Sequence, residues 1–350
     1  MTDRHTSRGG APRHLRAVVR WQLEHGHEVH VAAGETDDEP GDATVHVVSG
    51  LAARGAQAAD VERVWRGLQP DVVHLHTVVN PTVLEWGAAH RAVVTVQDHR
   101  YFCPGRGKWT RSGAVCRDAL SPSVCAACFE DEAYFTEILG LTERRLAALG
   151  ALRAIVLSDY MKRELVAAGV AAAGVTVIPP FVDALDPAVK ADGPACVLFV
   201  GRLTEHKGAR EAVQAWTLSR LDLPLVMAGT GPLREELVRA GAVVLGWLDP
   251  LSLSRVYRRA HALLFPSRWQ EPFGIAGLEA LSMGVPVAAW DSGGVGEWHG
   301  SGGLVPWGDV AGLAAALRHA VAGPRATPPR GFDREEQMAR LEAVYAETAV

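Results

Sequence analysis

Arg202 and Lys207 are two cations placed where a negatively charged ligand would bind. Both lie in Gly201–Gly208, directly after the apolar run Cys196–Val200 and before a predicted helix. Glycines let a ligand approach the backbone, and two cations at a helix N-terminus can neutralise a diphosphate. The alternative is a pair of solvated surface charges at a turn. Only four lysines occur in the chain, and this scarcity favours a specific role for Lys207.

Glu271 and Glu279 are two carboxylates whose setting suits hydroxyl groups. Pro272 predicts that a helix starts between them, and Gly274 and Gly277 leave its first turns without side chains. Because carboxylates repel phosphate, we expect both to accept hydrogen bonds from hydroxyl pairs of sugars, one of them a ribose. On a continuous helix they would be about 12 Å apart, outside the roughly 5–9.5 Å of glycosidase carboxyl pairs, which disfavours hydrolysis. In the structural alternative, Glu271 is a charge at the helix start and Glu279 a buried cap partner.

The elements that must position these residues alternate between short apolar runs and helical patterns, as in parallel sheets with crossover helices. The predicted strands are Glu28–Ala32, Val72–His76, Ala92–Val96, Ala154–Leu157, Val175–Ile178, Cys196–Val200, Leu223–Ala228, Ala242–Leu245, Ala262–Phe265, Val285–Ala289 and Gly303–Val305. Pro179–Pro194, with four prolines, is predicted to be a linker. Ligands of such sheets bind at the carboxyl ends of the strands, where both pairs of charged residues lie.

Length and composition agree with two domains. The chain has 350 residues, 48% hydrophobic and 21% charged, which suits a globular protein. We expect two doubly wound, Rossmann-like α/β domains facing a cleft, at 1–180 and 195–325, with a helix at 332–350 that returns to the first. The net charge of −5 argues against a general nucleic-acid binder. No apolar run approaches the roughly 20 residues of a membrane helix, and the start, MTDRHTSRGG, lacks the apolar core of a signal peptide, so a cytoplasmic location is expected.

The motifs of the second half resemble those of the retaining glycosyltransferases of family four, which have the GT-B fold. The resemblance covers nearly the whole chain and is strongest from Cys196 to Pro306. It implies that Glu271 contacts the donor sugar and Glu279 the ribose. It also implies that Arg202 and Lys207 bind the donor diphosphate. Further donor contacts implied by the resemblance are Gly10, Gly231, Leu248, Phe273, Gly274 and Ile275.

The implied activity is the retaining transfer of a sugar from a nucleoside-diphosphate sugar, such as a UDP-, GDP- or dTDP-sugar. The acceptor is a natural product, a glycan or a small metabolite. The chain has no Asp-x-Asp tripeptide, so cations and helix N-termini must stabilise the leaving diphosphate, and we expect catalysis without a metal. Two alternatives remain: an epimerase or phosphorylase on the same fold, and a non-catalytic donor-binding homologue that acts as a partner subunit.

The start of the first domain matches the family less fully. Gly9-Gly10 before a helix resembles the family's glycine loop, whose N–H groups approach the donor phosphates. The eight residues before it, MTDRHTSR, contain no apolar run, although the family has a central strand there. We therefore expect either that the sheet lacks this strand, which would expose the flanking strand edges, or that the true start lies upstream.

The residues after the strand Val93–Val96 also differ from the family. Gln97 stands where the family often has histidine, followed by Asp98 and His99. A glutamine donates and accepts hydrogen bonds but carries no proton at neutral pH, so we expect Gln97 to orient the sugar while Asp98 and His99 position the acceptor. His74 and His76, on one face of the preceding strand, either contact the donor or pack in the core.

Four of the five cysteines lie in one loop, 103–128, with the spacing Cys103-x12-Cys116-x8-Cys125-x2-Cys128. The ligand count satisfies a tetrahedral zinc site, although the spacing is looser than in a zinc ribbon. The loop has few aliphatic residues to form a core, so we expect a cross-link to stabilise it. A structural zinc ion is the favoured interpretation, with two disulfides or free thiols as alternatives. Family members with a similar loop imply that it shapes the acceptor side.

Overall fold

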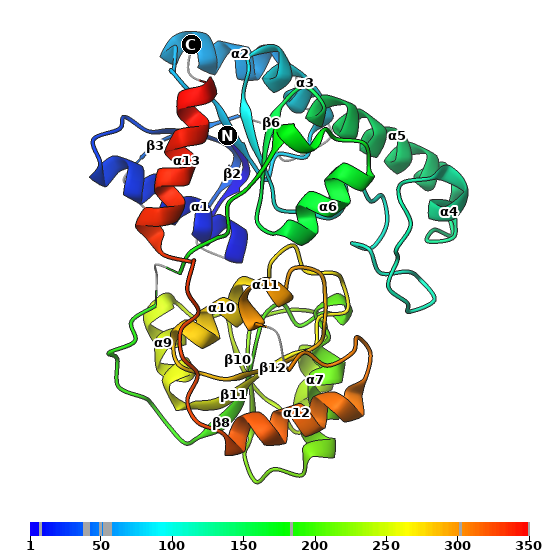
Figure 1. The fold of residues 1–350 in the computed structure, drawn as a ribbon, viewed down its shortest axis with the longest axis vertical. Helices are drawn as coiled ribbons and strands as arrows, with labels where there is room; N and C mark the ends of the chain where they lie inside the picture. Colours follow the sequence, from blue (N-terminus) through cyan, green and yellow to red (C-terminus); the bar gives the residue numbers. More distant parts are fainter. Residues whose placement is uncertain are drawn as a thin grey trace. The chain divides into compact units, whose positions relative to one another are not determined.

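The chain folds as two compact units. The computed structural model describes residues 1–6, 9–37, 43–48, 51, 58–182, 185–300 and 303–348. Unit 1 comprises Met1–Phe181 with Asp333–Val350, and unit 2 comprises Val182–Phe332. Each unit is a parallel sheet covered by helices (Figure 1). The predicted fold class, two Rossmann-like α/β domains, is confirmed.

Unit 1 is built on a parallel sheet of seven described strands in the order β3-β2-β1-β4-β5-β6-β7. The strands are β1 (Thr2–His5), β2 (His30–Thr36), β3 (Thr44–Val47), β4 (His74–His76), β5 (Val93–Val96), β6 (Arg153–Val156) and β7 (Val175–Val177). The helices are α1 (Gly10–Glu24), α2 (Ala58–Leu68), α3 (Pro81–Ala89), η1 (His99–Tyr101), α4 (Pro122–Ala126), α5 (Glu132–Leu149), α6 (Asp159–Ala167), η2 (Ala172–Gly174) and α13 (Arg334–Thr348). All four residues of β5, VVTV, are buried, as expected for a strand covered on both faces.

The prediction that the first sheet lacks its opening strand is wrong. Thr2–His5 forms β1 in the middle of the sheet and pairs in parallel with β2 and β4. Its side chains are polar, so hydrophobic periodicity gave no signal, but strand pairing uses backbone groups that every residue except proline supplies. Thr2 and His5 are buried, and the hydroxyl of Thr2 lies 3.0 Å from that of Thr77. Both neighbouring strand edges are therefore covered.

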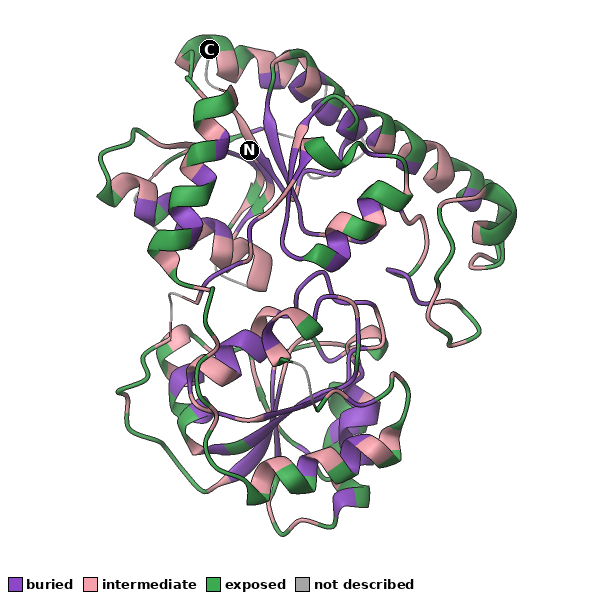
Figure 2. Cartoon of the chain, in the orientation of Figure 1, coloured by how far each residue is buried: buried purple, intermediate pink, exposed green. Residues whose placement is uncertain are grey.

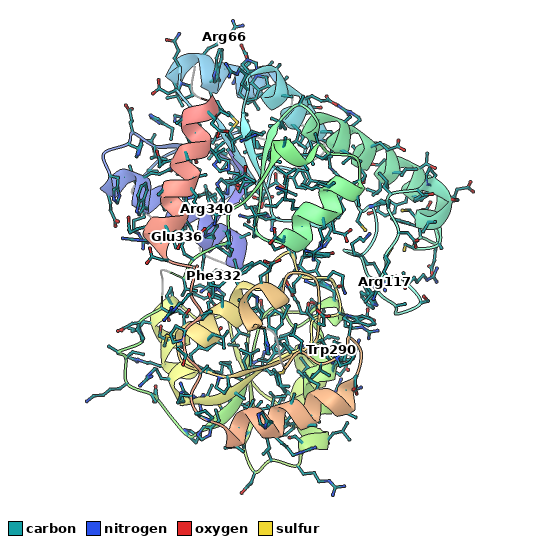
Figure 3. The ribbon with its side chains drawn as sticks, viewed as in Figure 1. Arg66, Arg117, Trp290, Phe332, Glu336 and Arg340 are labelled. Carbon is teal, nitrogen blue, oxygen red and sulfur yellow. The ribbon has the colours of Figure 1, made fainter. Side chains whose placement is uncertain are left out.

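The last helix, α13, packs on unit 1 against α1. Met338, Leu341 and Val344 share an apolar cluster with Val18 and Trp21 of α1. In Figure 3 the side chain of Arg340 projects from α13, and its guanidinium donates a hydrogen bond of 2.6 Å to the carbonyl of Val177. The C-terminal helix is therefore part of the core of unit 1.

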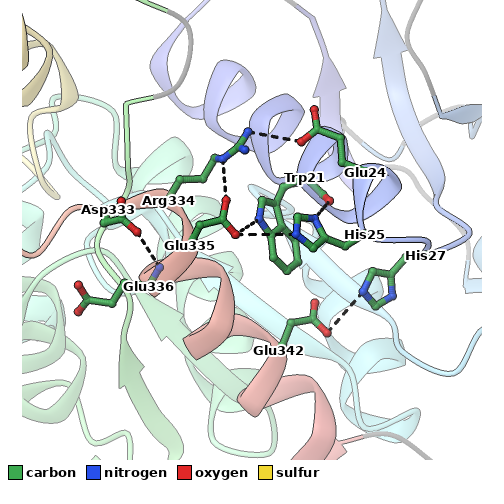
Figure 4. Close-up of polar contacts among 9 residues, drawn as sticks. All are labelled: Trp21, Glu24, His25, His27, Asp333, Arg334, Glu335, Glu336 and Glu342. Atoms are coloured by element: carbon green, nitrogen blue, oxygen red, sulfur yellow. Dashed lines mark hydrogen bonds and ion pairs between the residues drawn. The ribbon is translucent and has the colours of Figure 1, made fainter.

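Polar contacts also join α1 and the start of α13 (Figure 4). The indole N–H of Trp21 donates to Oε2 of Glu335 at 2.8 Å. The ion pair between Arg334 and Glu24 spans 3.5 Å. Since this ion pair is solvent-exposed, it adds at most about 1 kcal/mol, and apolar burial supplies most of the docking energy.

Unit 2 contains a parallel sheet of five described strands in the order β10-β9-β8-β11-β12. The strands are β8 (Cys196–Val200), β9 (Leu225–Ala228), β10 (Val243–Gly246), β11 (Ala260–Phe265) and β12 (Val287–Ala289). The helices are η3 (Glu205–Lys207), α7 (Ala209–Ser219), α8 (Arg234–Arg239), α9 (Pro250–Arg259), α10 (Ile275–Ser282), α11 (Gly296–His299) and α12 (Val310–Ala322). Figure 2 shows the buried central strands in purple between helices whose outer faces are exposed.

The predicted strand Gly303–Val305 is reduced to one bridge in unit 2. Val305 pairs with Trp290 in an isolated parallel bridge, and the N–H of Val305 donates to Ala289 at 2.9 Å. The indole N–H of the fully buried Trp290 donates to the carbonyl of Asp309 at 3.0 Å. The apolar residues near Val305 therefore belong to a single bridge between two loop segments and not to a sixth described strand.

The strand order of unit 2 places β8 and β11 side by side at its centre. The chain leaves β8 toward β9 on one side and β11 toward β12 on the other. Loops that diverge from neighbouring strands in this way leave room for a ligand at the carboxyl edge of a sheet. The loops after β8 and β11 are the segments that carry the charged motifs.

Candidate functional site

A buried ion pair joins the loops that follow β8 and β11. Nζ of Lys207, at the end of η3, lies 2.7 Å from Oε1 of Glu271. The hydroxyl of Ser267 donates to the same oxygen at 2.6 Å, and Nζ also lies 4.4 Å from the ring centre of Trp269. The Glu271 residue is 3% exposed, whereas the Lys207 side chain is 21% exposed. The arrangement holds one ammonium group in place while leaving part of it open to solvent.

The local field favours ionised Glu271. Burial raises the pKa of its carboxyl, but the charge of Lys207 and the hydrogen bonds from Lys207 and Ser267 outweigh that effect, so the pKa lies below its ordinary value. The same cations disfavour the charged form of the neighbouring His206. Burial, with the positive charges of Arg202 and Lys207, lowers the pKa of His206 to about 4. His206 is therefore neutral at pH 7, in a setting that repels additional cations.

Two glycines allow the loops of this site to pack backbone to backbone. Gly208 has φ +71°, and a β-carbon there would lie 1.7 Å from the carbonyl oxygen of Pro266. Gly293 has φ +61°, and its β-carbon would lie 2.4 Å from the carbonyl oxygen of Glu271. No other residue fits either position without moving the loop that carries Glu271.

Helix α10 starts later than the sequence suggests. Its first residue is Ile275, capped by Gly274 with φ +91°, so Pro272 precedes the helix. Glu271 is therefore not helical, and the separation inferred for a continuous helix does not apply. Gly277 does not leave the first turn bare either, because its β-carbon would lie 2.0 Å from the ring of Trp298.

Glu279 is held from a different element. It lies on α10 and is 5% exposed, and the hydroxyl of Tyr257 on α9 donates to its Oε2 at 3.1 Å. Among the other proposed donor contacts, Phe273 is buried and its carbonyl accepts a 2.7 Å hydrogen bond from Trp298. Leu248 is half-buried two residues after the end of β10.

The remaining donor contacts lie in loops near these elements. Arg202 is exposed and close enough to His206 to lower its pKa. Gly231 follows β9, and a β-carbon there would lie 2.4 Å from the carbonyl oxygen of Leu203. Gly10 belongs to unit 1, where it starts α1 after Gly9, whose φ is +108°; residues 7–8 before it lie outside the described chain.

In unit 1, Gln97 directly follows β5 and is buried. Its amide oxygen and nitrogen make no hydrogen bond within the described parts of the chain. A buried amide without partners costs stability, so both atoms are available for a ligand. Gln97 therefore places an unsatisfied buried amide directly after β5.

Asp98 and His99 are engaged with the protein. Asp98 accepts a 2.8 Å hydrogen bond from the N–H of Arg100 and forms a 3.0 Å ion pair with its guanidinium. Burial raises the pKa of Asp98, but Arg100 outweighs it and the net pKa is lowered. Nε2 of His99 lies 3.1 Å from the hydroxyl of Tyr160. Both side chains are thus fixed in orientation.

Asp3 is a group that the sequence reasoning missed because β1 was missed. Its carboxyl is near Arg100, Asp98 and Arg145, and Oδ1 is buried without a hydrogen bond in the described residues. Burial is the largest effect and raises the pKa of Asp3 to about 7. The polar end of β5 therefore has a second carboxyl beside Asp98.

His74 and His76 pack in the core of unit 1. Their ring centres are 3.9 Å apart, and His74 contacts the hydroxyl groups of Tyr345 at 2.6 Å and Thr95 at 2.7 Å. Burial holds the pKa of both histidines well below the ordinary value. Neutral rings in these contacts fit the packing alternative for His74.

The four clustered cysteines are partly buried. No disulfide joins them in the described chain, and no residue from 110 to 134 is buried. Within the described chain, no three His, Cys, Asp or Glu side chains are arranged to hold a metal. Nor does any helix in the described ranges have the length and hydropathy to cross a membrane.

Three residues that contact the two carboxylates or their partners, Ser267, Trp269 and Tyr257, were not predicted. Ser267 and Trp269 are part of the same short motif as Glu271, so their adjacency was a usable signal. Tyr257 precedes Glu279 by 22 residues on another helix, and no local pattern connects the two.

Family models match both halves of the chain. A model described as "Glycosyltransferase Family 4" matches residues 8–184, and one described as "Glycosyl transferases group 1" matches residues 194–322. A glycogen synthase of Mycobacterium tuberculosis is 31% identical over 310 residues, which is 77% of this chain and 64% of the relative. A 2-deoxystreptamine glucosyltransferase of Streptomyces kanamyceticus is 32% identical over 149 residues, 38% of each protein.

Solved structures share the fold at low sequence identity. A sucrose-phosphate synthase from Thermosynechococcus elongatus aligns with a TM-score of 0.70 and 20% identity, covering 99% of this chain and 95% of the other. Anabaena HepE in complex with UDP-glucose aligns with a TM-score of 0.68 and 16% identity, covering 99% and 98%. These alignments extend across both units.

Proposed function

Since this chain belongs to the group 1 and family 4 glycosyltransferases, we propose that it transfers a sugar from a nucleoside-diphosphate donor to a hydroxyl-bearing acceptor, with retention of anomeric configuration. The observation that carries the proposal is the Lys207–Glu271 pair at the carboxyl edge of the second sheet. HepE, whose structure contains UDP-glucose, supports a nucleotide-sugar donor.

The donor binds to unit 2 in this proposal. Arg202 and Lys207 neutralise the diphosphate, and Lys207 is held in position by Glu271. The carboxylate of Glu271 accepts hydrogen bonds from the sugar, with the N–H groups of Phe273, Gly274 and Ile275 as further contacts. Glu279, oriented by Tyr257, accepts from the ribose hydroxyls, a pairing that suits a fixed carboxylate.

The transfer needs charge stabilisation at the leaving group. The bond from the anomeric carbon to the β-phosphate oxygen breaks and leaves its electron pair on that oxygen. The acceptor oxygen bonds to the anomeric carbon on the same face, and its proton passes to the departing phosphate. Arg202 and Lys207 stabilise the negative charge as it develops, so we propose that the reaction proceeds without a metal.

Unit 1 supplies the acceptor side in this proposal. Because the phosphate oxygen takes the proton, Gln97 is not required as a base. Its amide nitrogen, which has no partner in the described chain, donates a hydrogen bond to the substrate, and its amide oxygen accepts one. Asp98 and His99 orient the acceptor hydroxyl. The acceptor is a natural product, a glycan or a small metabolite; the glucosyltransferase relative named for 2-deoxystreptamine makes a hydroxylated natural product a useful first class to test.

One specific observation favours a second candidate, a non-catalytic donor-binding subunit. It is the amide of Gln97 in a position where the family often has a histidine. Two experiments distinguish the transferase from the non-catalytic subunit. A thermal-shift screen with UDP-, GDP-, ADP- and dTDP-sugars finds the donor that binds, and nucleotide release is then measured with that donor and pooled acceptors. Binding with turnover in the presence of EDTA supports the metal-free transferase, and NMR of the product must show the donor's anomeric configuration. Binding without turnover across the pools favours the subunit, and restoration of turnover only by Mg²⁺ or Mn²⁺ overturns metal independence.

A further inference from the structure

We propose that Cys103, Cys116, Cys125 and Cys128 together bind one zinc ion through their sulfur atoms, and that this ion holds the segment 103–128 against unit 1. Two of the sulfurs already converge. Sγ of Cys128 and Sγ of Cys103 lie 3.6 and 4.0 Å from the point that a β-carbon on Gly105 would occupy. A larger residue at Gly105 would fill the space beside both sulfurs.

The other two cysteines lie in short turns of the same segment. The N–H of Cys116 donates to the carbonyl of Lys108 at 2.9 Å, in a hairpin closed by the bridge between Trp109 and Val115. Cys125 lies on α4, and the N–H of Cys128 donates to its carbonyl at 3.0 Å. This turn puts the second pair of cysteines three residues apart, on one side of the helical turn. Cys125 also interacts electrostatically with both Cys116 and Cys128.

The surroundings offset part of the cost of a negatively charged ligand set. When four thiols bind Zn²⁺, each sulfur loses its proton and forms one S–Zn bond, and the product carries two negative charges. Burial raises the pKa of the Cys103 thiol, and the backbone N–H groups of Lys108, Gly105 and Gly107 offset part of that effect. The ammonium of Lys108 is buried and interacts with the sulfurs of Cys103 and Cys125. Lys108 also forms an ion pair with Glu164, with 3.0 Å between Nζ and Oε2, so only part of its positive charge compensates the sulfurs.

The segment has no apolar core of its own. No residue between 110 and 134 is buried, and α4 contributes no buried side chain. A segment without a core is commonly held by a metal or by disulfides. In the described chain no three of these thiols are placed as ligands of one ion, so the proposed zinc binding requires α4 and the hairpin to move closer together.

Such a site would also fix the polar residues after β5. The N–H of Cys103 donates to the carbonyl of His99 at 2.7 Å, so a zinc-bound Cys103 anchors the end of η1. His99 and the neighbouring Asp98 would then keep their orientation because of a metal that does not touch substrate. Zinc in this position is structural, independent of whether the donor site is metal-free.

The test measures zinc in the purified full-length protein by mass spectrometry, after reconstitution with Zn²⁺ under reducing conditions and removal of loose metal. We expect about one zinc per chain, and a drop of at least fivefold in Cys125→Ser and Cys128→Ser. Cys196→Ala is the matched control, because Cys196 lies in β8 of unit 2, and it keeps the zinc content.

A second measurement does not depend on variants that fold. Co²⁺ added to the metal-free wild-type protein should give the intense visible bands of tetrahedral thiolate coordination, and zinc should remove them. Bound zinc should also protect four thiols from a thiol reagent. Less than about 0.2 zinc per chain with four reactive thiols would overturn the proposal, as would two disulfides found in the protein as isolated and retained in the active form.

Discussion

Lys207 and Glu271 form a buried ion pair of 2.7 Å between loops that follow adjacent strands, and the lysine remains partly open to solvent. The pair therefore has two separable roles. It stabilises the packing of the two loops, because a buried carboxylate without its cation costs about 3–5 kcal/mol. It also presents a fixed ammonium where the proposed diphosphate binds.

Replacing Lys207 separates these roles. Lys207→Ala should lower kcat/KM for sugar transfer at least 100-fold, the scale expected when a charge-stabilising donor is lost, and should lower the melting temperature of unit 2. The double variant Lys207→Met/Glu271→Gln should recover most of the melting temperature but not the transfer. Lys190→Ala, an exposed lysine of the same unit, is the control and should change neither. Recovery of transfer in the double variant would contradict the assignment.

Gln97 should show a trade-off between stability and transfer. Its buried amide has no partner in the described chain, so Gln97→Met removes an unsatisfied polar group and should raise the melting temperature by a degree or more. The same change removes the proposed substrate contact and should lower sugar transfer about tenfold. Gln97→Ala should also lower sugar transfer about tenfold. Glu271→Ala should nearly abolish transfer. Equal, small losses for Gln97→Ala, Glu271→Ala and Lys207→Ala in one turnover assay would disprove the site.

Asp3 should make unit 1 less stable as the pH rises. Burial raises its pKa from 3.8 to about 7, so the folded state favours the protonated form. The resulting stabilisation is complete below pH 3.8 and is lost as the pH rises through about 7. Asp3→Asn should therefore raise the melting temperature at pH 8 by about 2–6 °C and have little effect near pH 4.

Melting curves across this pH range test the Asp3 assignment. Asp71→Asn, which removes an exposed carboxylate in the same unit, is the control and should give no difference that depends on pH. An Asp3→Asn variant that is equally destabilised at pH 4 and pH 8 would show that the carboxyl is ionised throughout.

Gly277 tests the packing beneath α10. Because a β-carbon would lie 2.0 Å from the Trp298 ring, Gly277→Ala should destabilise unit 2 by roughly 1–3 kcal/mol and displace Glu279. The paired control is Gly296→Ala, where the nearest atom is 3.8 Å away. Thermal unfolding should show a loss of several degrees for Gly277→Ala alone, and an unchanged melting temperature would refute the contact.

How far the fold could be predicted depends on how much of each element is apolar. The strands β5 and β8 were found because nearly all their residues are hydrophobic and buried. β1 was missed because its position at the centre of the sheet is set by backbone pairing with strands distant in sequence. Nothing in the side chains of Thr2–His5 reveals that environment.

Site residues could be predicted from the sequence where they lie in short motifs of chemically suitable residues. Lys207 and Glu271 were singled out separately, and the structure joins them directly. Tyr257 was not found, because its contact with Glu279 depends on the packing of α9 against α10. The role of Gly277 was misjudged for the same reason, since the tryptophan that fills its space comes from α11.

The path of the chain has a consequence for how the protein is made. Unit 2 is one continuous stretch, Val182–Phe332, whereas unit 1 needs both Met1–Phe181 and the last helix. On the ribosome, unit 2 can fold as soon as its own residues have emerged. The first sheet must wait for Met338, Leu341 and Val344 to cover its apolar face. The half of the protein that is synthesised first is therefore the half that is completed last.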